Sequence, residues 1–280
     1  MTRVGAVDIG TNSTRLLIAD VTGERVSDIE RRSTVTRLGE GVDSGRILLP
    51  GPIARTRRVL AEYKRALDAA GAERTLAVAT SAVRDAVNGR DFLAGLAASY
   101  GFATRLLSGD EEARLTRRGV GALGSGTLLL DIGGGSTELI LADFRTSLDV
   151  GSVRLTERFL HSDPPHASEL AAAAGFVRGL LPDLRVDDAV GVAGTVTQLH
   201  ELVGDLTLES VEREFERLAA LPIVERERVP RMDPGRAPVI LGGAIIVVEV
   251  LRRYGLEELA WSVRDLLDGV ALEVAGAQRE

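Results

Sequence analysis

Residues 7–18 read VDIGTNSTRLLI, and the same pattern returns at residues 130–141 as LDIGGGSTELIL, with Asp131 lying 123 positions after Asp8. In each copy an apolar run ends in an aspartate, and a turn of glycine and small polar residues leads into a second apolar run. The second run lacks the spacing of an amphipathic helix, so the pattern predicts strand, turn and strand. One such turn is also typical of an ordinary tight hairpin. Two copies half a chain apart favour duplicated halves, which we expect to face each other across a cleft.

The two turns have the composition of phosphate-binding loops. Glycine lets the backbone fold sharply and present several N–H groups to one point, which forms a nest for phosphate oxygens. The aspartate that ends each first strand, Asp8 or Asp131, is placed to reach a divalent cation or its waters, because Mg²⁺ takes carboxylate and water oxygens. The candidate phosphate-binding residues are Gly10, Thr11, Asn12 and Ser13 in the first turn and Gly133, Gly134, Gly135, Ser136 and Thr137 in the second.

Length and composition indicate a globular protein of two domains. At 280 residues the chain has room for two domains, and the glycine-rich segment 121–126 is where we place the boundary. We expect no membrane association, because no apolar run reaches the roughly 20 residues that span a bilayer and no charged-then-apolar leader precedes Val4. The chain has no cysteine, which excludes disulfides and thiolate metal sites and fits a cytoplasmic location.

The charge of the chain limits its partners. A net charge of −7 argues against broad nucleic-acid binding, which depends on a basic surface. Lys64 is the only lysine, so specific contacts to anions must come from arginine or from the backbone. Arginine suits this role because its guanidinium binds phosphate through two parallel hydrogen bonds.

Hydrophobic periodicity and glycine or proline punctuation predict a similar order of elements in both halves. In the first half we expect strands at 4–9, 15–20 and 26–35, a helix from Pro50 to Gly71, a strand at 76–79, a helix at 90–100 and a strand at 103–107. In the second half we expect strands at 127–130, 137–142 and 147–150, helices at 153–160 and 168–181, a strand at 189–192, helices at 208–220 and 237–254, a strand at 259–263, and a closing helix from Arg264.

Two further turns follow predicted strands. Residues 80–88 begin a polar turn and helix at the end of the strand at 76–79, where open α/β sheets bind their ligands. Residues 193–197, which include Gly194 and Thr195, form a turn of small residues after the strand at 189–192. A helix N-cap would explain the composition of this second turn equally well.

The segment from Ser108 to Glu112 has the pattern of a helix start. Ser108 followed three residues later by Glu111 predicts a capping box, in which each side chain bonds the backbone of the other residue. The capping box leaves Glu112 without a structural role. A carboxylate at this position, in the first turn of a helix just before the second repeat, would lie at the expected cleft.

Several common catalytic motifs are missing. The sequence has no Walker A motif, no Gly-x-Ser-x-Gly and no His-Glu-x-x-His. Glu138 stands where a dinucleotide-binding fingerprint requires its third glycine. The three histidines share no metal-ligand spacing, so we predict that they are surface or capping residues.

Taken together, the motifs resemble those of the exopolyphosphatase/guanosine pentaphosphatase (Ppx/GppA) family, within the superfamily of actin-like ATPases, sugar kinases and heat-shock ATPases. The segments that carry the resemblance are 7–13, 79–86, 108–113, 131–138 and 194–195. Segments 154–165 and 233–236 are similar to those of the short, two-domain actinobacterial-type members. The matching segments run through nearly the whole chain.

The resemblance implies an α/β fold with two ribonuclease-H-like domains and an interdomain cleft. It places the first domain at 1–123 and the second at 124–264, with a closing helix at about 265–280 that packs back on the first. The implied activity is Mg²⁺-dependent hydrolysis of the terminal phosphoanhydride of inorganic polyphosphate or of guanosine pentaphosphate (pppGpp).

The resemblance also implies roles for particular residues. The family's catalytic glutamate falls on Glu112, its acid pair near the metal on Asp131 and Glu138, and its phosphate-contacting arginine on Arg84. Gly194 and Thr195 lie in a further matching segment and join the phosphate-binding candidates, and Asp8 joins the metal candidates. The chain lacks the additional C-terminal helical region of longer members, so we expect a preference for short polyphosphate chains and weak processivity.

Two other functions stay open at this point. One is an ATP-dependent small-molecule kinase of the same superfamily, which would form ADP only with an acceptor present. The other is a non-catalytic sensor of polyphosphate or of a nucleotide alarmone, which would bind without releasing phosphate. The sequence also leaves open whether the protein forms a homodimer.

Overall fold

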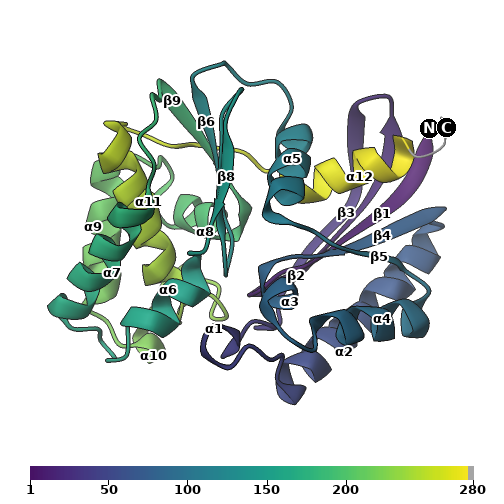
Figure 1. Ribbon diagram of the computed structural model, residues 1–280, viewed down its shortest axis with the longest axis horizontal. Helices are drawn as coiled ribbons and strands as arrows, with labels where there is room; N and C mark the ends of the chain where they lie inside the picture. The colour runs from purple at the N-terminus through teal and green to yellow at the C-terminus, as the bar shows by residue number, and fades with distance from the viewer. Residues whose placement is uncertain (277–280) are drawn as a thin grey trace. The chain divides into compact units, whose positions relative to one another are not determined.

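The computed structural model describes residues 1–276 and divides into two compact units (Figure 1). Unit 1 consists of Met1–Ala122 together with Arg264–Glu280, and unit 2 is Leu123–Val263. Both boundaries lie one residue before the positions expected from the sequence. Residues 277–280 of the expected closing helix lie outside the described residues. The cleft expected between the halves stays a prediction.

Unit 1 is built on a five-stranded mixed sheet. Its first three strands, β1 (Thr2–Ile9), β2 (Ser13–Thr22) and β3 (Arg25–Val35), form an antiparallel meander. Strand β4 (Arg74–Ala79) pairs in parallel with β1, and β5 (Ala103–Leu106) pairs in parallel with β4. The strand order is therefore β3-β2-β1-β4-β5, and the strands predicted in the first half are confirmed.

Helices cover both faces of this sheet. In Figure 1, α2 and α4 lie on one face, and α5 and α12 lie on the other. Pro50 and Pro52 fit the first turn of α2, where a backbone N–H has no helical partner to lose, and Gly71 ends this helix with a left-handed φ of 69°. The helices of unit 1 are α1 (Val42–Gly45), α2 (Pro50–Ala70), α3 (Ser81–Asp85), α4 (Gly89–Tyr100), α5 (Gly109–Val120) and α12 (Leu266–Gly276).

The closing helix α12 is part of the core of unit 1. Leu267 and Val270 of this helix are fully buried in one cluster with Val4 and Leu17 of the first hairpin. A helix that is apolar on nearly all sides is stable only when it is surrounded by protein, and α12 meets that condition. The described part of the closing helix therefore packs on the first unit, as expected.

Unit 2 repeats the sheet of unit 1. Strands β6 (Thr127–Ile132), β7 (Thr137–Ile140) and β8 (Arg145–Leu148) form an antiparallel meander. Strand β9 (Asp188–Val192) is parallel to β6, and β10 (Ala260–Trp261) is parallel to β9. The order β10-β9-β6-β7-β8 is the order of unit 1 read from the other edge, which confirms the duplicated halves and the α/β fold class.

The helices of unit 2 enclose a second core. Buried side chains of α7, α9 and α11 join those of β6 in one apolar cluster, and α11 is buried along almost its whole length. The helices of unit 2 are α6 (Ser152–Phe159), α7 (Ala167–Leu180), α8 (Ala193–Val203), α9 (Leu208–Ala219), α10 (Ile223–Arg226) and α11 (Ile240–Tyr254).

Some limits in the second half differ from the prediction. The strand expected at 147–150 ends at Leu148, because the N–H of Val150 donates to the Leu148 carbonyl at 2.7 Å and the chain turns there. The helix expected from position 237 begins at Ile240, because Val239 closes a separate turn by donating to the carbonyl of Arg236. The strand expected at 259–263 is reduced to the two residues of β10.

The two predicted hairpins have the same register and the same turn. Asp8 lies opposite Arg15, and Asp131 lies opposite Glu138. In the first turn the N–H of Gly10 donates to the carbonyl of Ser13 at 3.0 Å. In the second turn the corresponding bond, from Gly133 to Ser136, is also 3.0 Å long. The sequence repeat is therefore a repeat of backbone hydrogen bonding as well.

Candidate phosphate and metal site

The first candidate phosphate loop is a tight turn that requires glycine. A Cβ atom on Gly10 would lie 2.9 Å from the Ser13 carbonyl oxygen, which is closer than real Cβ atoms approach. The carbonyls of the turn are held from outside, because Thr36 and Arg37 donate to Asn12 at 2.9 and 2.8 Å. These hydrogen bonds fix the backbone of the loop at Asn12.

Two other contacts fix the same loop. The N–H of Gly39 donates to the Thr11 carbonyl at 2.8 Å, and a Cβ on Gly39 would lie 2.2 Å from a carbon of the Thr11 side chain. The Thr11 hydroxyl bonds the hydroxyl of Ser81 at 3.0 Å, which ties the loop to the start of α3. The turn at 80–88 therefore lies beside the first loop.

Several buried polar atoms at this loop lack a partner. Within residues 1–276, no hydrogen-bonding group meets Asp8 Oδ1, Ser13 Oγ or either polar atom of the Asn12 side chain. Buried polar groups in folded proteins are nearly always hydrogen-bonded, so such a group at a glycine turn indicates a place prepared for a ligand. Hydroxyl and amide donors fit phosphate oxygens, and a carboxylate oxygen fits a hard cation or its waters.

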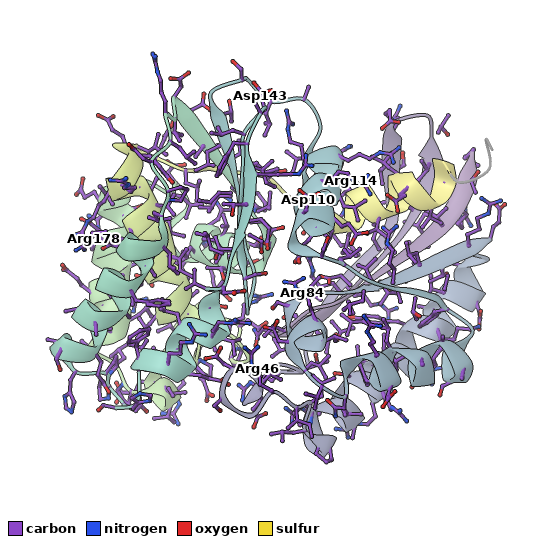
Figure 2. All side chains as sticks on the ribbon, in the orientation of Figure 1. Arg46, Arg84, Asp110, Arg114, Asp143 and Arg178 are labelled. Carbon is purple, nitrogen blue, oxygen red and sulfur yellow. The ribbon has the colours of Figure 1, made fainter. Side chains whose placement is uncertain are left out.

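Glu112 and Arg84 meet in unit 1. Arg84 Nη1 donates to the Leu107 carbonyl at 2.8 Å and lies 3.5 Å from Glu112 Oε2. In Figure 2, Arg84 lies beneath α5, the helix on which Asp110 and Arg114 are labelled. Arg84 reaches this place from α3, which follows β4 at the carboxyl end of the sheet.

The capping box explains how Glu112 is placed. Ser108 N–H donates to Glu111 Oε2 at 2.8 Å, and Glu111 N–H donates to the Ser108 hydroxyl oxygen at 3.2 Å, which confirms the predicted capping box. Glu112 makes the first helical bond, from its N–H to the Ser108 carbonyl at 2.9 Å. Its side chain is 9% exposed. A carboxylate that is buried next to an arginine and is not needed for the cap is suited to act on a water or a ligand.

A buried cluster of charges next to the first loop was not identified from the sequence. Arg15 Nε donates to Asp8 Oδ2 at 2.8 Å, and Arg15 Nη1 donates to Asp265. Arg31 Nη2 bonds both oxygens of Asp268 at 3.0 Å. Burial raises the pKa of Asp8 above its usual range, and the adjacent Arg15 opposes this rise. Burial likewise raises the pKa of Asp268, and Arg31 opposes it.

In unit 2 two carboxylates face each other. Asp131 and Glu138 are buried and lie directly opposite each other on β6 and β7. Side chains at such positions have Cβ atoms about 5 Å apart, and like charges there are destabilising. Ser147 donates to Glu138 Oε1 at 2.7 Å. Two facing carboxylates fit a divalent cation, whose charge removes their repulsion.

This pair suits Mg²⁺ better than a metal that needs a full set of protein ligands. In the part of the chain that the structure describes, no three His, Cys, Asp or Glu side chains are grouped for a metal ion. Mg²⁺ is usually bound by one or two carboxylates together with waters and substrate phosphates. The residues present therefore fit Mg²⁺, although Asp8 already forms an ion pair with Arg15.

The second phosphate loop is held by the start of α6. Val153 and Arg154 donate to the Gly134 carbonyl at 2.8 and 3.1 Å, and Ser152 donates to Gly133 at 3.0 Å. A Cβ on Gly151 would lie 2.6 Å from the nitrogen of Gly135, so glycine is required where the chain passes the loop. Unit 2 thus fixes its loop through carbonyl groups, as unit 1 does with residues 36–39.

The third turn differs from the N-cap interpretation. Helix α8 begins at Ala193, so Thr195 lies inside the helix and does not cap it. Ala193 has a φ of 67°, which is uncommon for a residue with a side chain. A Cβ on Gly194 would lie 2.1 Å from the guanidinium of Arg236, so this glycine allows an arginine to lie against the turn. Arg236 was not predicted as a site residue, because it lies in a separate loop before α11.

The three histidines lie at the surface or at helix ends, as predicted. His166 precedes α7, and its N–H donates to Glu169 at 2.8 Å. His161 is exposed. The ring of His200 bonds the Gly204 carbonyl and stacks on Trp261 with centroids 4.2 Å apart.

The two units share one α/β topology, and each carries a glycine turn behind an aspartate, which defines the class as proteins of two duplicated α/β domains. The model of the Ppx/GppA phosphatase family matches residues 17–277, and the chain belongs to that family.

The comparisons with known proteins agree over the whole chain. The sequence is 42% identical to Exopolyphosphatase 2 of Mycobacterium tuberculosis, with 99% of each chain covered. Among solved structures, an exopolyphosphatase-like protein superposes with a TM-score of 0.92 at 28% identity, covering 97% of both chains. The Ppx/GppA phosphatase of Aquifex aeolicus superposes with a TM-score of 0.76 at 31% identity, covering 98% of this chain and 99% of that one. The expected two-domain fold is therefore confirmed.

Among residues 1–276, none of the helices is both long and apolar enough to cross a membrane.

Proposed function

We propose that this protein is a Mg²⁺-dependent exopolyphosphatase that releases terminal orthophosphate from inorganic polyphosphate, with a preference for short chains, and that it also accepts pppGpp. The observation that carries the proposal is Glu112, a buried carboxylate 3.5 Å from Arg84 in the unit that also holds the first phosphate loop. Family membership and the 42% identity to a protein named as an exopolyphosphatase support the same reaction.

The phosphate-binding groups come from the loops and from arginine. In this proposal, the N–H groups of residues 10–13 and 133–137, together with Arg84, bind the terminal phosphates, and Gly194 and Thr195 add a third contact. Phosphoryl transfer depends mainly on positioning and on neutralising charge, which these groups supply. Arginine contributes a fixed positive charge with two parallel donors.

Glu112 acts on the attacking water. The water oxygen forms the new bond to the terminal phosphorus while the bridging P–O bond breaks, and the shortened chain leaves with the bonding electron pair. Glu112 accepts the proton that the water loses and then returns it to solvent. Asp131 and Glu138, with Asp8 through its Oδ1 atom, would hold Mg²⁺, which neutralises charge on the leaving phosphate when it is bound.

The test is phosphate release measured in parallel on tripolyphosphate, long polyphosphate, pppGpp and ATP, with and without Mg²⁺. We expect release from tripolyphosphate that requires Mg²⁺ and falls with chain length. Equal efficiency on chains of three and of several hundred phosphates would refute the short-chain preference. No release from pppGpp would remove that substrate. ADP formation from ATP only in the presence of an acceptor would show a kinase, and binding without release would show a sensor.

A further inference from the structure

One guanidinium joins the first phosphate loop to the closing segment of the chain. Arg15 donates to Asp8 through Nε and Nη2, each 2.8 Å from Oδ2, and to Asp265 through Nη1. Arg15 is 14% exposed, and both carboxylates are 7 to 8% exposed, so the contacts are shielded from water. Charged hydrogen bonds in such surroundings are stronger and more directional than at the surface.

Asp265 is itself held firmly by the start of α12. Its Oδ1 accepts from the N–H of Leu267 at 2.9 Å, and its own N–H donates to Asp268 Oδ2 at 3.0 Å. Asp265 thus caps the helix at the N–H of Leu267, and Asp268 bonds back to the backbone of Asp265. Asp268 also accepts two bonds from Arg31 on β3. The carboxylate that holds Arg15 is therefore fixed by a helix end and by a second strand.

The helix behind Asp265 lies in close contact with α5. A Cβ on Gly119 would lie 2.0 Å from the Asp265 carbonyl oxygen, and a Cβ on Gly269 would lie 1.9 Å from the Leu115 carbonyl oxygen. Glycine in both helices thus lets two backbones touch. Because α5 carries Glu112 in its first turn, the closing segment contacts both the helix of Glu112 and the partner of Asp8.

We propose that Asp265 is a positioning residue for the reaction: it holds Arg15, and Arg15 sets the direction of the Asp8 carboxylate. This inference rests on the proposed function, in which Asp8 faces the metal or its waters. Asp8 Oδ1 has no hydrogen-bonding partner in the described chain, so only the bonds to Oδ2 decide where Oδ1 points. Without Asp265, the Arg15 guanidinium loses the ion pair that fixes its Nη1 atom.

Asp265→Asn separates this role from that of helix capping. Asparagine caps helices as well as aspartate does, so the bond from Leu267 is kept while the charge that binds Arg15 is lost. The matched control is Asp20→Asn. Asp20 lies on β2 opposite Arg3 of β1, at the end of the same hairpin that is far from the loop. It accepts two bonds from Arg3, at 2.9 and 3.0 Å. Each variant removes the charge of one carboxylate that binds an arginine: Asp265→Asn affects Arg15, and Asp20→Asn affects Arg3.

Two readouts test the proposal. The first is the Arg15 Nε–H signal in nitrogen-15 NMR spectra of the protein without Mg²⁺ or substrate, assigned with Arg15→Lys. We expect a sharp, slowly exchanging signal in wild type and in Asp20→Asn, and a broadened or lost signal in Asp265→Asn. The second readout is steady-state phosphate release from tripolyphosphate at varied Mg²⁺.

In the kinetic readout we expect Asp265→Asn to lower kcat and to raise the Mg²⁺ concentration for half-maximal rate, each by about tenfold, the low end of the range for residues that orient metal ligands. We expect KM for tripolyphosphate to stay near the wild-type value, and Asp20→Asn to resemble wild type. A folded Asp265→Asn protein with a sharp Arg15 signal or with wild-type kcat and Mg²⁺ dependence would overturn the proposal. If wild type releases no phosphate, the proposed function fails, while the NMR signal still decides whether Asp265 holds Arg15.

Discussion

Arg15 and Glu138 occupy the same position of two equivalent hairpins, each directly opposite the aspartate that ends the preceding strand. In unit 1 the arginine forms an ion pair with Asp8 at 2.8 Å. In unit 2 a glutamate at this position leaves two acidic side chains facing each other. The duplication is therefore symmetric in backbone and asymmetric in charge at this position.

Glu112→Gln should fold as wild type does and release phosphate at least about 100 times more slowly, because general-base removal costs 10²–10⁴-fold. The matched control is Glu111→Gln, since glutamine also completes a capping box and Glu111 has no proposed part in the reaction. The measurements are phosphate release and the melting temperature. Near-wild-type release by Glu112→Gln would exclude its role as the base.

Glu138→Gln should remove most of the stabilisation that Mg²⁺ gives to the protein. In the absence of Mg²⁺ the change also removes repulsion between two facing carboxylates, which is worth up to about 1 kcal/mol. The measurement is the melting temperature with and without Mg²⁺, with Ser147→Ala as a control that keeps both carboxylates. An unchanged Mg²⁺-dependent shift in Glu138→Gln would place the metal elsewhere.

Acidification should weaken the start of α7 through Glu169. The backbone N–H of His166 lowers the pKa of Glu169 below its ordinary value of 4.5, and burial opposes this only in part. The folded protein therefore binds this proton less readily than the unfolded chain, so the stabilisation is present above pH 4.5 and is lost as the pH falls through the lower folded value.

The check is urea unfolding between about pH 3 and pH 6, a window that follows from the lowered pKa of Glu169. Glu169→Gln should lose less stability on acidification than wild type does. Glu209→Gln removes the same charge at an exposed position of α9 that caps no helix, and should follow the wild-type curve. Parallel curves for wild type and Glu169→Gln would contradict the prediction.

Gly269→Ala should destabilise unit 1 by about 1–3 kcal/mol, the usual cost of overpacking. The new Cβ would lie 1.9 Å from the Leu115 carbonyl oxygen, so α5 and α12 would have to separate. Gly175→Ala in α7 is the control, because no atom lies within 4 Å of its Cβ position and alanine favours helix by roughly 0.5–1 kcal/mol. Urea unfolding of both variants measures the difference, and equal stabilities would contradict close helix contact.

Much of the fold follows from local sequence signals. The repeat around Asp8 and Asp131 predicts both hairpins, and Ser108 with Glu111 predicts the start of α5, because these features depend on neighbouring residues. The limits near Leu148 and Ile240 could not be predicted, since they depend on turn hydrogen bonds that leave no pattern in the sequence.

The charge cluster around Arg15 was not predicted, because its members lie far apart in the sequence. Arg15 bonds Asp265 across 250 positions, and no periodicity links the two. The helix start at Asp265 and Asp268 does carry a readable capping pattern. The first repeat has Arg15 where the second has Glu138, and this difference is visible in the sequence. A largely buried arginine at this position needs a carboxylate partner, which the sequence does not identify.

Unit 1 is made from both ends of the chain, since α12 completes a core that begins with Val4. On the ribosome, the first 122 residues emerge long before residues 266–276 are translated. The apolar sheet face that Leu267 and Val270 cover therefore stays partly exposed to solvent while unit 2 is synthesised. A nascent chain that is stalled or cleaved between the two units would therefore expose an apolar surface that favours aggregation. Unit 2 is one continuous segment, so it is the better candidate for expression as a separate fragment.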